Sequence, residues 1–189
     1  YDPSLEITCL NGQMKIGSLT FETKDPGSYI RQVIADHKSP RFEYLPSFTG
    51  GLVGYFSYDY LKYAEPTLRL DAEDTEGFKD VDLMLFDKVI AFDNFRQKII
   101  LMVNIDLEHL ETEYNRASLE LRSMADLIKN GEPKEDIPGH CTTPVTPLFQ
   151  KEEYCEMVEK AKHYIYEGDI FQVVLANRLK AKIEGSILD

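Results

Sequence analysis

Gln172 is a polar side chain in the centre of a stretch, residues 169–179, whose neighbouring central residues are apolar. A buried amide needs hydrogen-bond partners, because leaving it without them costs about 1–3 kcal/mol. Gln172 is therefore either a structural glutamine with satisfied partners or a group that orients a polar part of a substrate. If the stretch is a strand, side chains alternate between its faces, and four residues share the face of Gln172: Ile170, Val174, Ala176 and Arg178. Arg178 can also be structural, paired to a carboxylate.

The rest of the sequence contains few motifs that indicate catalysis or ligand binding. The sequence contains no G-x-x-x-x-G-K phosphate loop, no G-x-G-x-x-G and no G-x-S-x-G nucleophile elbow. Gly50, Gly51 and Gly54 form too short a signal for nucleotide binding, so we expect close packing there. The cysteines lack C-x-x-C spacing and indicate free thiols in a reducing compartment: Cys9, Cys141 and Cys155. The histidines are scattered and we expect them to be structural or exposed: His37, His109, His140 and His163.

Composition limits the class of protein. The 189 residues are 43% hydrophobic, which is enough for a core and for one domain, or one domain and part of a second. Acidic residues outnumber basic ones by 33 to 21, for a net charge of −12, so we expect no nucleic-acid partner. No apolar run reaches the roughly 18 residues of a membrane span and no signal peptide is visible, so we expect a cytoplasmic protein with no membrane association.

The first sixty residues predict short strands and one helix. Asn11-Gly12 is a strong hairpin signal between strands at 5–10 and 13–21. Asp25-Pro26 opens a helix, because Asp is a good N-cap and Pro suits the first turn. Residues 50–59 predict a strand. The buried face of the helix is expected to contain Tyr29, Ile30, Val33 and Ile34.

The middle of the chain predicts an exposed acidic loop, a hairpin and a long helix. Residues 71–80 are acidic and typical of a turn-rich loop. Strands at 83–92 and 98–103, separated by Asp93-Asn94, indicate a hairpin. Apolar residues from Leu107 to Ile128 recur at steps of three and four, which predicts an amphipathic helix lying on a sheet and ending at Gly131.

The C-terminal third predicts a linker, a helix and a buried strand. Residues 131–147 are rich in Pro, Gly and polar residues. Residues 154–165 follow as a helix that ends at Gly168. The strand at 169–179 is apolar on both faces and should lie inside a covered sheet. The fold class is therefore α+β, a mostly antiparallel sheet with packed helices.

Three parts of the sequence resemble, in order and spacing, the large chorismate-using subunit of anthranilate synthase. They are Thr49 to Asp59, Asp82 to Asp93, and Glu167 to Leu175. The resemblance implies an incomplete chorismate-binding fold. Residues 1–130 would be the N-terminal region, 131–147 a linker, and 148–189 the truncated start of the chorismate-binding domain. Both ends look cut, because the chain begins within a turn without Met and stops soon after a strand.

The resemblance also gives Gln172 a role. Water-adding members of this family typically have a lysine there as general base, since water needs a proton acceptor as it attacks. Ammonia carries its own lone pair and needs orientation, which an amide supplies. Gln172 therefore favours an amine-adding enzyme, and the resemblance implies that it orients ammonia.

The implied reaction is a lyase-type conversion of chorismate and ammonia to anthranilate and pyruvate, in tryptophan biosynthesis. The implied partners are a glutamine amidotransferase subunit that supplies ammonia and tryptophan as feedback inhibitor. Magnesium is the implied cofactor, with ligands expected beyond Asp189, so we expect this chain alone to be inactive. Two alternatives stay open: aminodeoxychorismate synthase component I of the folate branch, and a non-catalytic regulatory or docking module.

Overall fold

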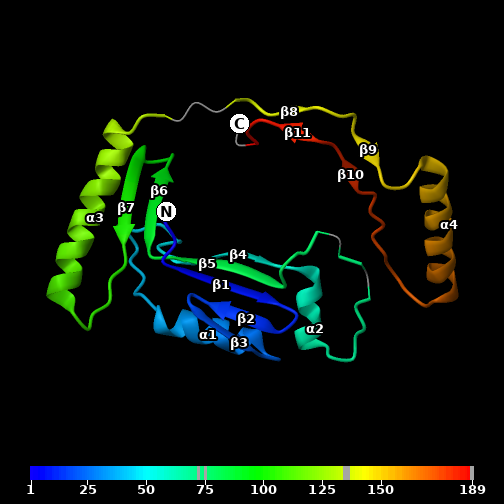
Figure 1. The fold of residues 1–189 in the computed structure, drawn as a ribbon, viewed down its shortest axis with the longest axis horizontal. Coiled ribbons are helices and arrows are strands. Elements are labelled where there is room, and N and C mark those ends of the chain that lie inside the picture. The colour runs from blue at the N-terminus through cyan, green and yellow to red at the C-terminus, as the bar shows by residue number, and fades with distance from the viewer. Residues whose placement is uncertain (72, 75, 134–136, 188–189) are drawn as a thin grey trace. The chain divides into compact units, whose positions relative to one another are not determined.

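The computed structural model describes residues 1–71, 73–74, 76–133 and 137–187, and the chain divides into two compact units. The first is Tyr1–Gly131 and the second is Glu132–Asp189. Figure 1 shows that the first unit holds a sheet with helix α1 beside it, and a separate hairpin accompanied by helix α3. The second unit contains helix α4 and four short strands.

The sheet of the first unit has five antiparallel strands in the order β3-β2-β1-β5-β4. Their side chains alternate between a buried and an accessible face, most clearly in β5. This alternation is the pattern of an antiparallel sheet covered on one side. The strands are β1 Leu5–Leu10, β2 Gln13–Ile16, β3 Leu19–Glu22, β4 Gly51–Phe56 and β5 Val81–Phe86.

The predicted turn at Asn11-Gly12 is confirmed. Leu10 pairs directly with Gln13, which leaves a two-residue loop. Both loop residues have positive φ, 49° at Asn11 and 83° at Gly12. A two-residue hairpin turn of this type needs positive φ at both positions, and Asn followed by Gly meets that requirement at the lowest cost.

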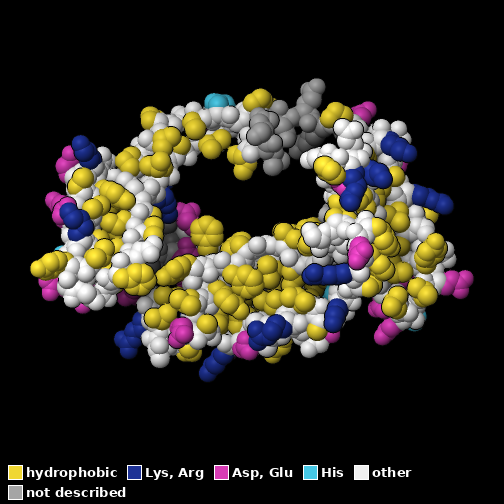
Figure 2. All heavy atoms as spheres, turned by 180° about the vertical axis from the view of Figure 1, so that it is seen from behind, with side chains coloured by type: hydrophobic (Ala, Val, Ile, Leu, Met, Phe, Trp, Pro, Cys, Tyr) yellow, Lys and Arg dark blue, Asp and Glu magenta, His cyan; other side chains and the backbone are white. Residues whose placement is uncertain are grey.

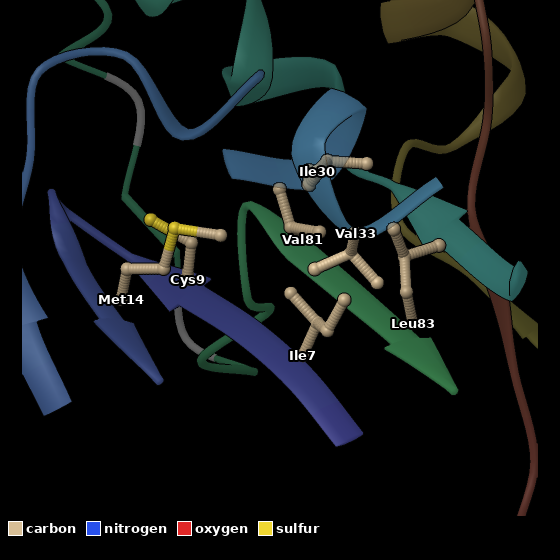
Figure 3. Close-up of a cluster of buried hydrophobic side chains, with 7 residues drawn as sticks. All are labelled: Ile7, Cys9, Met14, Ile30, Val33, Val81 and Leu83. Atoms are coloured by element: carbon tan, nitrogen blue, oxygen red, sulfur yellow. The ribbon is translucent and has the colours of Figure 1, made fainter. Parts of the chain in front are cut away.

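Helix α1, Pro26–Asp36, begins as predicted. The Asp25 carboxylate accepts a hydrogen bond from the Ser28 amide at 3.1 Å. Ile30 and Val33 are buried against the sheet, where they join a cluster of β-strand side chains (Figure 3): Ile7, Cys9, Met14, Val81 and Leu83. The prediction that Tyr29 and Ile34 are buried was wrong, since they are 42% and 54% exposed. The sheet therefore covers only part of the apolar face of α1. Tyr29 lies at the edge of this contact, where its ring packs on the Phe21 ring with 4.7 Å between the centroids.

Hydrophobic side chains also remain on the surface of this sheet. Figure 2 shows them gathered over the sheet of the first unit, with charged side chains at its margins. The cross-strand pair Val53 and Met84 belongs to this group, with 49% and 40% of their surface exposed. One face of the sheet is thus filled by α1, and the other keeps apolar residues accessible.

The strand predicted at 83–92 is two strands in two sheets. β5 ends at Phe86 and β6, Lys88–Asp93, begins after the single residue Asp87. β6 pairs with β7, Lys98–Val103, in a separate two-stranded sheet, which confirms the predicted hairpin. The predicted loop at 71–80 contains no helix or strand in its described residues, while residues 72 and 75 lie outside them.

Asn104, just after β7, ties this hairpin to the five-stranded sheet. Its backbone amide donates to the Asp87 carbonyl at 2.8 Å. Its side-chain amide donates to the Thr49 carbonyl at 2.7 Å and to the Asp87 carbonyl at 3.1 Å. One residue therefore links the end of β7, the β5–β6 junction and the segment before β4.

Helix α3, Leu110–Asn130, packs against β7, as predicted for a helix lying on a sheet. Ala117 and Met124 are its buried residues. The helix begins three residues later than predicted. Leu107 is 75% exposed, and the neighbouring Asp106 carboxylate accepts from the Glu108 amide at 2.9 Å in a turn that precedes the helix.

Helix α4 of the second unit, Lys151–Glu167, begins three residues before the predicted start at residue 154 and ends before Gly168, as predicted. Gln150 and Glu153 form a reciprocal capping box at its start. Gly168 ends it in the left-handed conformation, with φ 83°. Within the described part of the chain, no helix is long and apolar enough to cross a membrane.

Two short ladders join the segments on either side of α4. β8, His140–Cys141, pairs with β11, Ile183–Glu184. β9, Thr146–Pro147, pairs with β10, Leu179–Lys180. The segment 131–147, expected as a linker, thus contributes two strands to the second unit.

The prediction of a buried strand at 169–179 was wrong. Only Leu179 at its end belongs to a strand, and residues 170–178 have no regular structure. Phe171 and Val174 are 92% and 82% exposed. A strand buried on both faces needs hydrogen-bonded neighbours and covering layers. Among the described residues, no strand lies alongside 170–178, so the apolar pattern has nothing to pack against.

Candidate active site

Gln172 lies in the irregular segment between α4 and β10, and its side chain is exposed. It has no hydrogen-bond partner among the described residues. The four residues expected on its face do not form one face with it, because the strand is absent. Arg178, one of the four, is exposed and has an interaction partner. The structure therefore leaves the amide of Gln172 available to donate and to accept a hydrogen bond.

The end of this segment is anchored to the start of α4. The Asn177 side chain accepts from the Phe149 amide at 3.0 Å and donates to the Phe149 carbonyl at 2.9 Å. The Tyr154 hydroxyl donates to the Leu175 carbonyl at 3.1 Å. These contacts fix residues 175–177 a few residues after Gln172, while Gly168 fixes the chain before it. Gln172 therefore lies in the middle of an irregular segment whose two ends are held by hydrogen bonds and by the end of α4.

The metal expected from the resemblance has no ligand set in this part of the chain. Over residues 1–71, 73–74, 76–133 and 137–187, no group of three or more His, Cys, Asp or Glu side chains is placed to hold a metal ion. Hard cations such as Mg²⁺ bind through several oxygen ligands. The described residues thus do not fit a magnesium site.

A buried polar cluster in the first unit was missed by the sequence reasoning. Asp80, expected in an exposed acidic loop, is 2% exposed. Its carboxylate accepts hydrogen bonds from the Asn11 amide at 2.7 Å, the Lys62 ammonium at 2.8 Å and the Tyr63 hydroxyl at 2.7 Å. Lys62 and Tyr63 come from the short helix α2, Leu61–Ala64. The only sequence signal was the position of Asp80 directly before the apolar residues of β5.

Tyr63 is the centre of this cluster. Its hydroxyl also accepts from the Gly12 amide at 2.7 Å and lies 3.4 Å from the Cys9 sulfur. Burial raises the pKa of the Tyr63 hydroxyl, and its hydrogen bonds with Cys9 and Asp80 raise the pKa further. A phenol that keeps its proton can donate to a buried carboxylate and stabilise it. The cluster joins the β1–β2 turn, α2 and the start of β5, so its role is to hold the fold.

The glycine-rich strand β4 shows close packing, as predicted. A Cβ on Gly54 would lie 2.0 Å from the Asp82 carbonyl oxygen of the neighbouring strand. A Cβ on Gly50 would lie 2.7 Å from the Asn104 side-chain nitrogen. Gly54 thus lets the backbone of β5 approach β4, and Gly50, just before β4, leaves room for the Asn104 side chain.

The fold and sequence match known proteins over nearly the whole chain. The family described as chorismate binding enzyme matches residues 3–189, and the chain belongs to that family. Within it, the chain is similar to anthranilate synthase component 1. It is 36% identical to the protein of Aquifex aeolicus (strain VF5) over 175 residues, which is 88% of this chain and 34% of the relative. It is 34% identical to the protein of Acinetobacter calcoaceticus over 194 aligned positions, which is 98% of this chain and 39% of the relative.

A solved structure supports the same family. The crystal structure of anthranilate synthase component I from Streptococcus pneumoniae TIGR4 matches with a TM-score of 0.78 and 27% identity. The match covers 99% of this chain and 42% of that chain. The mixed, mostly antiparallel α+β fold expected from the sequence is thus confirmed. The chain spans between a third and two fifths of the length of the two relatives named above.

Proposed function

We propose that this chain is part of the large subunit of an anthranilate synthase. The intact subunit would convert chorismate and ammonia to anthranilate, pyruvate and water. The amine forms a new C–N bond to the ring, the ring hydroxyl leaves as water, and elimination of the pyruvate side chain makes the ring aromatic. The observation that carries the proposal is the sequence similarity to anthranilate synthase component 1 proteins, which extends over 88–98% of this chain.

The proposed partners are those that the family resemblance implies. Ammonia would come from a glutamine amidotransferase subunit, and tryptophan would inhibit the intact subunit. Magnesium would be held by ligands outside the described residues and would act there as a Lewis acid. The proposed location is the cytoplasm.

Gln172 is proposed to orient the incoming ammonia. Its amide carries both donors and an acceptor, and it cannot remove a proton. An exposed amide without a partner among the described residues is free to bind a small polar molecule. The anchors at Gly168 and Asn177 limit how far it can move from such a site.

The test uses the intact subunit that contains this sequence. Anthranilate formation from chorismate and ammonia is followed by fluorescence. We expect the Gln172→Ala variant to lose about hundredfold in ammonia-dependent turnover, the loss that misplacing a reacting group can cause. Gln32→Ala, an exposed glutamine on α1, is the matched control and should keep full turnover. Unchanged turnover in Gln172→Ala would reject the role of this residue.

The same assay separates the alternatives. A folate-branch enzyme would form aminodeoxychorismate and no fluorescent anthranilate. A non-catalytic module would leave chorismate unchanged even in the intact protein with its amidotransferase. We also expect the 189-residue chain alone to form no anthranilate, and fluorescence from that chain would contradict this expectation.

A further inference from the structure

The first unit contains a pocket of about 400 Å³ with an unusual charge pattern. The pocket lies between the end of α1, the segment that follows it, and the first residues of β4. Its apolar lining includes Leu45, Leu52 and Leu85. Leu85 belongs to β5 and is 4% exposed, so the pocket reaches the sheet.

The lining contains two cationic side chains, Lys38 and Arg41, together with the imidazole of His37. None of the fourteen lining residues is Asp or Glu. This is notable because acidic residues outnumber basic ones by 33 to 21 in the whole sequence. Within the described part of the chain, Lys38 and Arg41 have neither an ion pair nor a side-chain hydrogen bond. Both cations are therefore available to a ligand.

The end of a helix attracts cations, and this accounts for some of the pattern. His37 caps α1, and its Nδ1 lies 2.8 Å from the Val33 carbonyl, to which it donates. The Nε2 atom is then left for other contacts. Arg41 lies five residues beyond the last residue of α1, outside the reach of the helix dipole. The helix therefore does not explain why Arg41 lines the pocket without an acidic partner.

We propose that this pocket binds a small organic carboxylate with an apolar body. The carboxylate would pair with Arg41 and Lys38, because a guanidinium matches the two oxygens of a carboxylate and a lysine adds a second charge. The apolar body would lie on Leu45, Leu52 and Leu85. The volume is near the lower end for ligand pockets, which suits a molecule with a single ring.

Benzoate is a suitable probe, and benzamide is its neutral analogue of the same shape. Binding to the 189-residue chain is followed by ligand-detected NMR and by shifts of backbone amide signals around residues 45–52. We expect benzoate to bind with a Kd on the order of 1 mM, which is ordinary for so small a ligand. Benzamide should bind at least about fivefold more weakly, because it lacks the charge that Arg41 and Lys38 recognise.

Matched double variants test the residues. Lys38→Gln with Arg41→Gln should weaken benzoate binding about tenfold or more. Lys24→Gln with Arg31→Gln makes the same change in net charge at two exposed residues outside the pocket, and should leave the Kd unchanged. All four positions are exposed, so the fold should survive, which circular dichroism checks. Equal affinity for benzoate and benzamide would overturn the proposal. So would an unchanged Kd in the first double variant, or an equal loss in both.

Discussion

The Tyr63 hydroxyl donates a 2.7 Å hydrogen bond to Oδ2 of Asp80, a carboxylate that is 2% exposed. The same oxygen accepts from the Asn11 amide, and Oδ1 pairs with Lys62 at 2.8 Å. Three chain segments far apart in sequence therefore meet at one charge. A buried carboxylate is tolerated only when its hydrogen bonds and an opposite charge offset the loss of water, and here both are present.

Removing this carboxylate should strongly destabilise the first unit. Asp80→Ala leaves the Lys62 ammonium, the Tyr63 hydroxyl and the Asn11 amide without their acceptor. We expect a loss of about 3–5 kcal/mol in the free energy of unfolding, the usual cost of breaking a buried pair. Urea denaturation followed by circular dichroism measures it. Asp82→Ala removes a more exposed carboxylate, paired to Lys79 at 2.9 Å, and should cost less than about 1 kcal/mol. Similar losses in the two variants would contradict the role of the cluster.

Alkaline pH should destabilise the chain through two tyrosines. Burial raises the pKa of Tyr63 and of Tyr60, so the folded state holds these protons more tightly than the unfolded state. Their contribution to stability is complete below the unfolded pKa near 10, and is lost as the pH rises above it. The free energy of unfolding should therefore fall as the pH rises above about 10.

Two tyrosine variants test whether Tyr63 causes this pH dependence. Tyr63→Phe should be less stable at neutral pH, but its stability should fall less steeply with rising pH, because one titrating group is gone. Tyr44, which is 73% exposed, provides the control. Tyr44→Phe should keep the steep decline. An identical slope in Tyr63→Phe and in the unchanged chain would show that Tyr63 does not carry the effect.

Two glycines of β4 provide a steric comparison. Gly54 and Gly51 both have positive φ, +155° and +137°. A Cβ at Gly54 would meet the Asp82 carbonyl oxygen at 2.0 Å, whereas at Gly51 the nearest atom is a Phe48 ring carbon at 3.7 Å. Gly51→Ala should cost about 1–2 kcal/mol of backbone strain. Gly54→Ala should cost at least about 2 kcal/mol more, because the strands must separate. The denaturation midpoints of the two variants measure this difference, and equal midpoints would contradict a steric clash at Gly54.

Met124 tests the packing of α3 on the hairpin. It is fully buried, at 0% exposure, so Met124→Ala should leave a cavity and cost about 2–5 kcal/mol. Leu119→Ala on the same helix removes a side chain that is 65% exposed and should cost less than about 1 kcal/mol. Thermal unfolding followed by circular dichroism compares them. If both variants melt together with the unchanged chain, α3 does not depend on this contact.

The features predicted correctly are those whose chemistry is local. Asn11-Gly12 satisfies a two-residue turn, Asp25 caps α1, and Gly168 ends α4, each within a few residues of sequence. A pattern of this kind needs no knowledge of distant partners. Such local signals predicted helices α1, α3 and α4 and the hairpins around Asn11-Gly12 and Asp93-Asn94.

The errors concern residues whose state depends on distant partners. The apolar run through Asp87 does not show that the chain changes sheets there. The acidic surroundings of Asp80 hide the fact that Lys62 and Tyr63 bury it. The stretch around Gln172 has the composition of a buried strand, yet the described residues provide no neighbouring strand. Its proposed role came from family resemblance, and local geometry adds only that its amide is accessible.

Asn104 links the wall of the proposed carboxylate pocket to the β6–β7 hairpin. Thr49 and Gly50 line that pocket, and the Asn104 side chain holds the Thr49 carbonyl at 2.7 Å. If β6 and β7 detach from the junction at Asp87, this wall of the pocket loses its anchor. Ligand affinity would then serve as a gauge of hairpin docking, declining under mild denaturant before the five-stranded sheet itself unfolds.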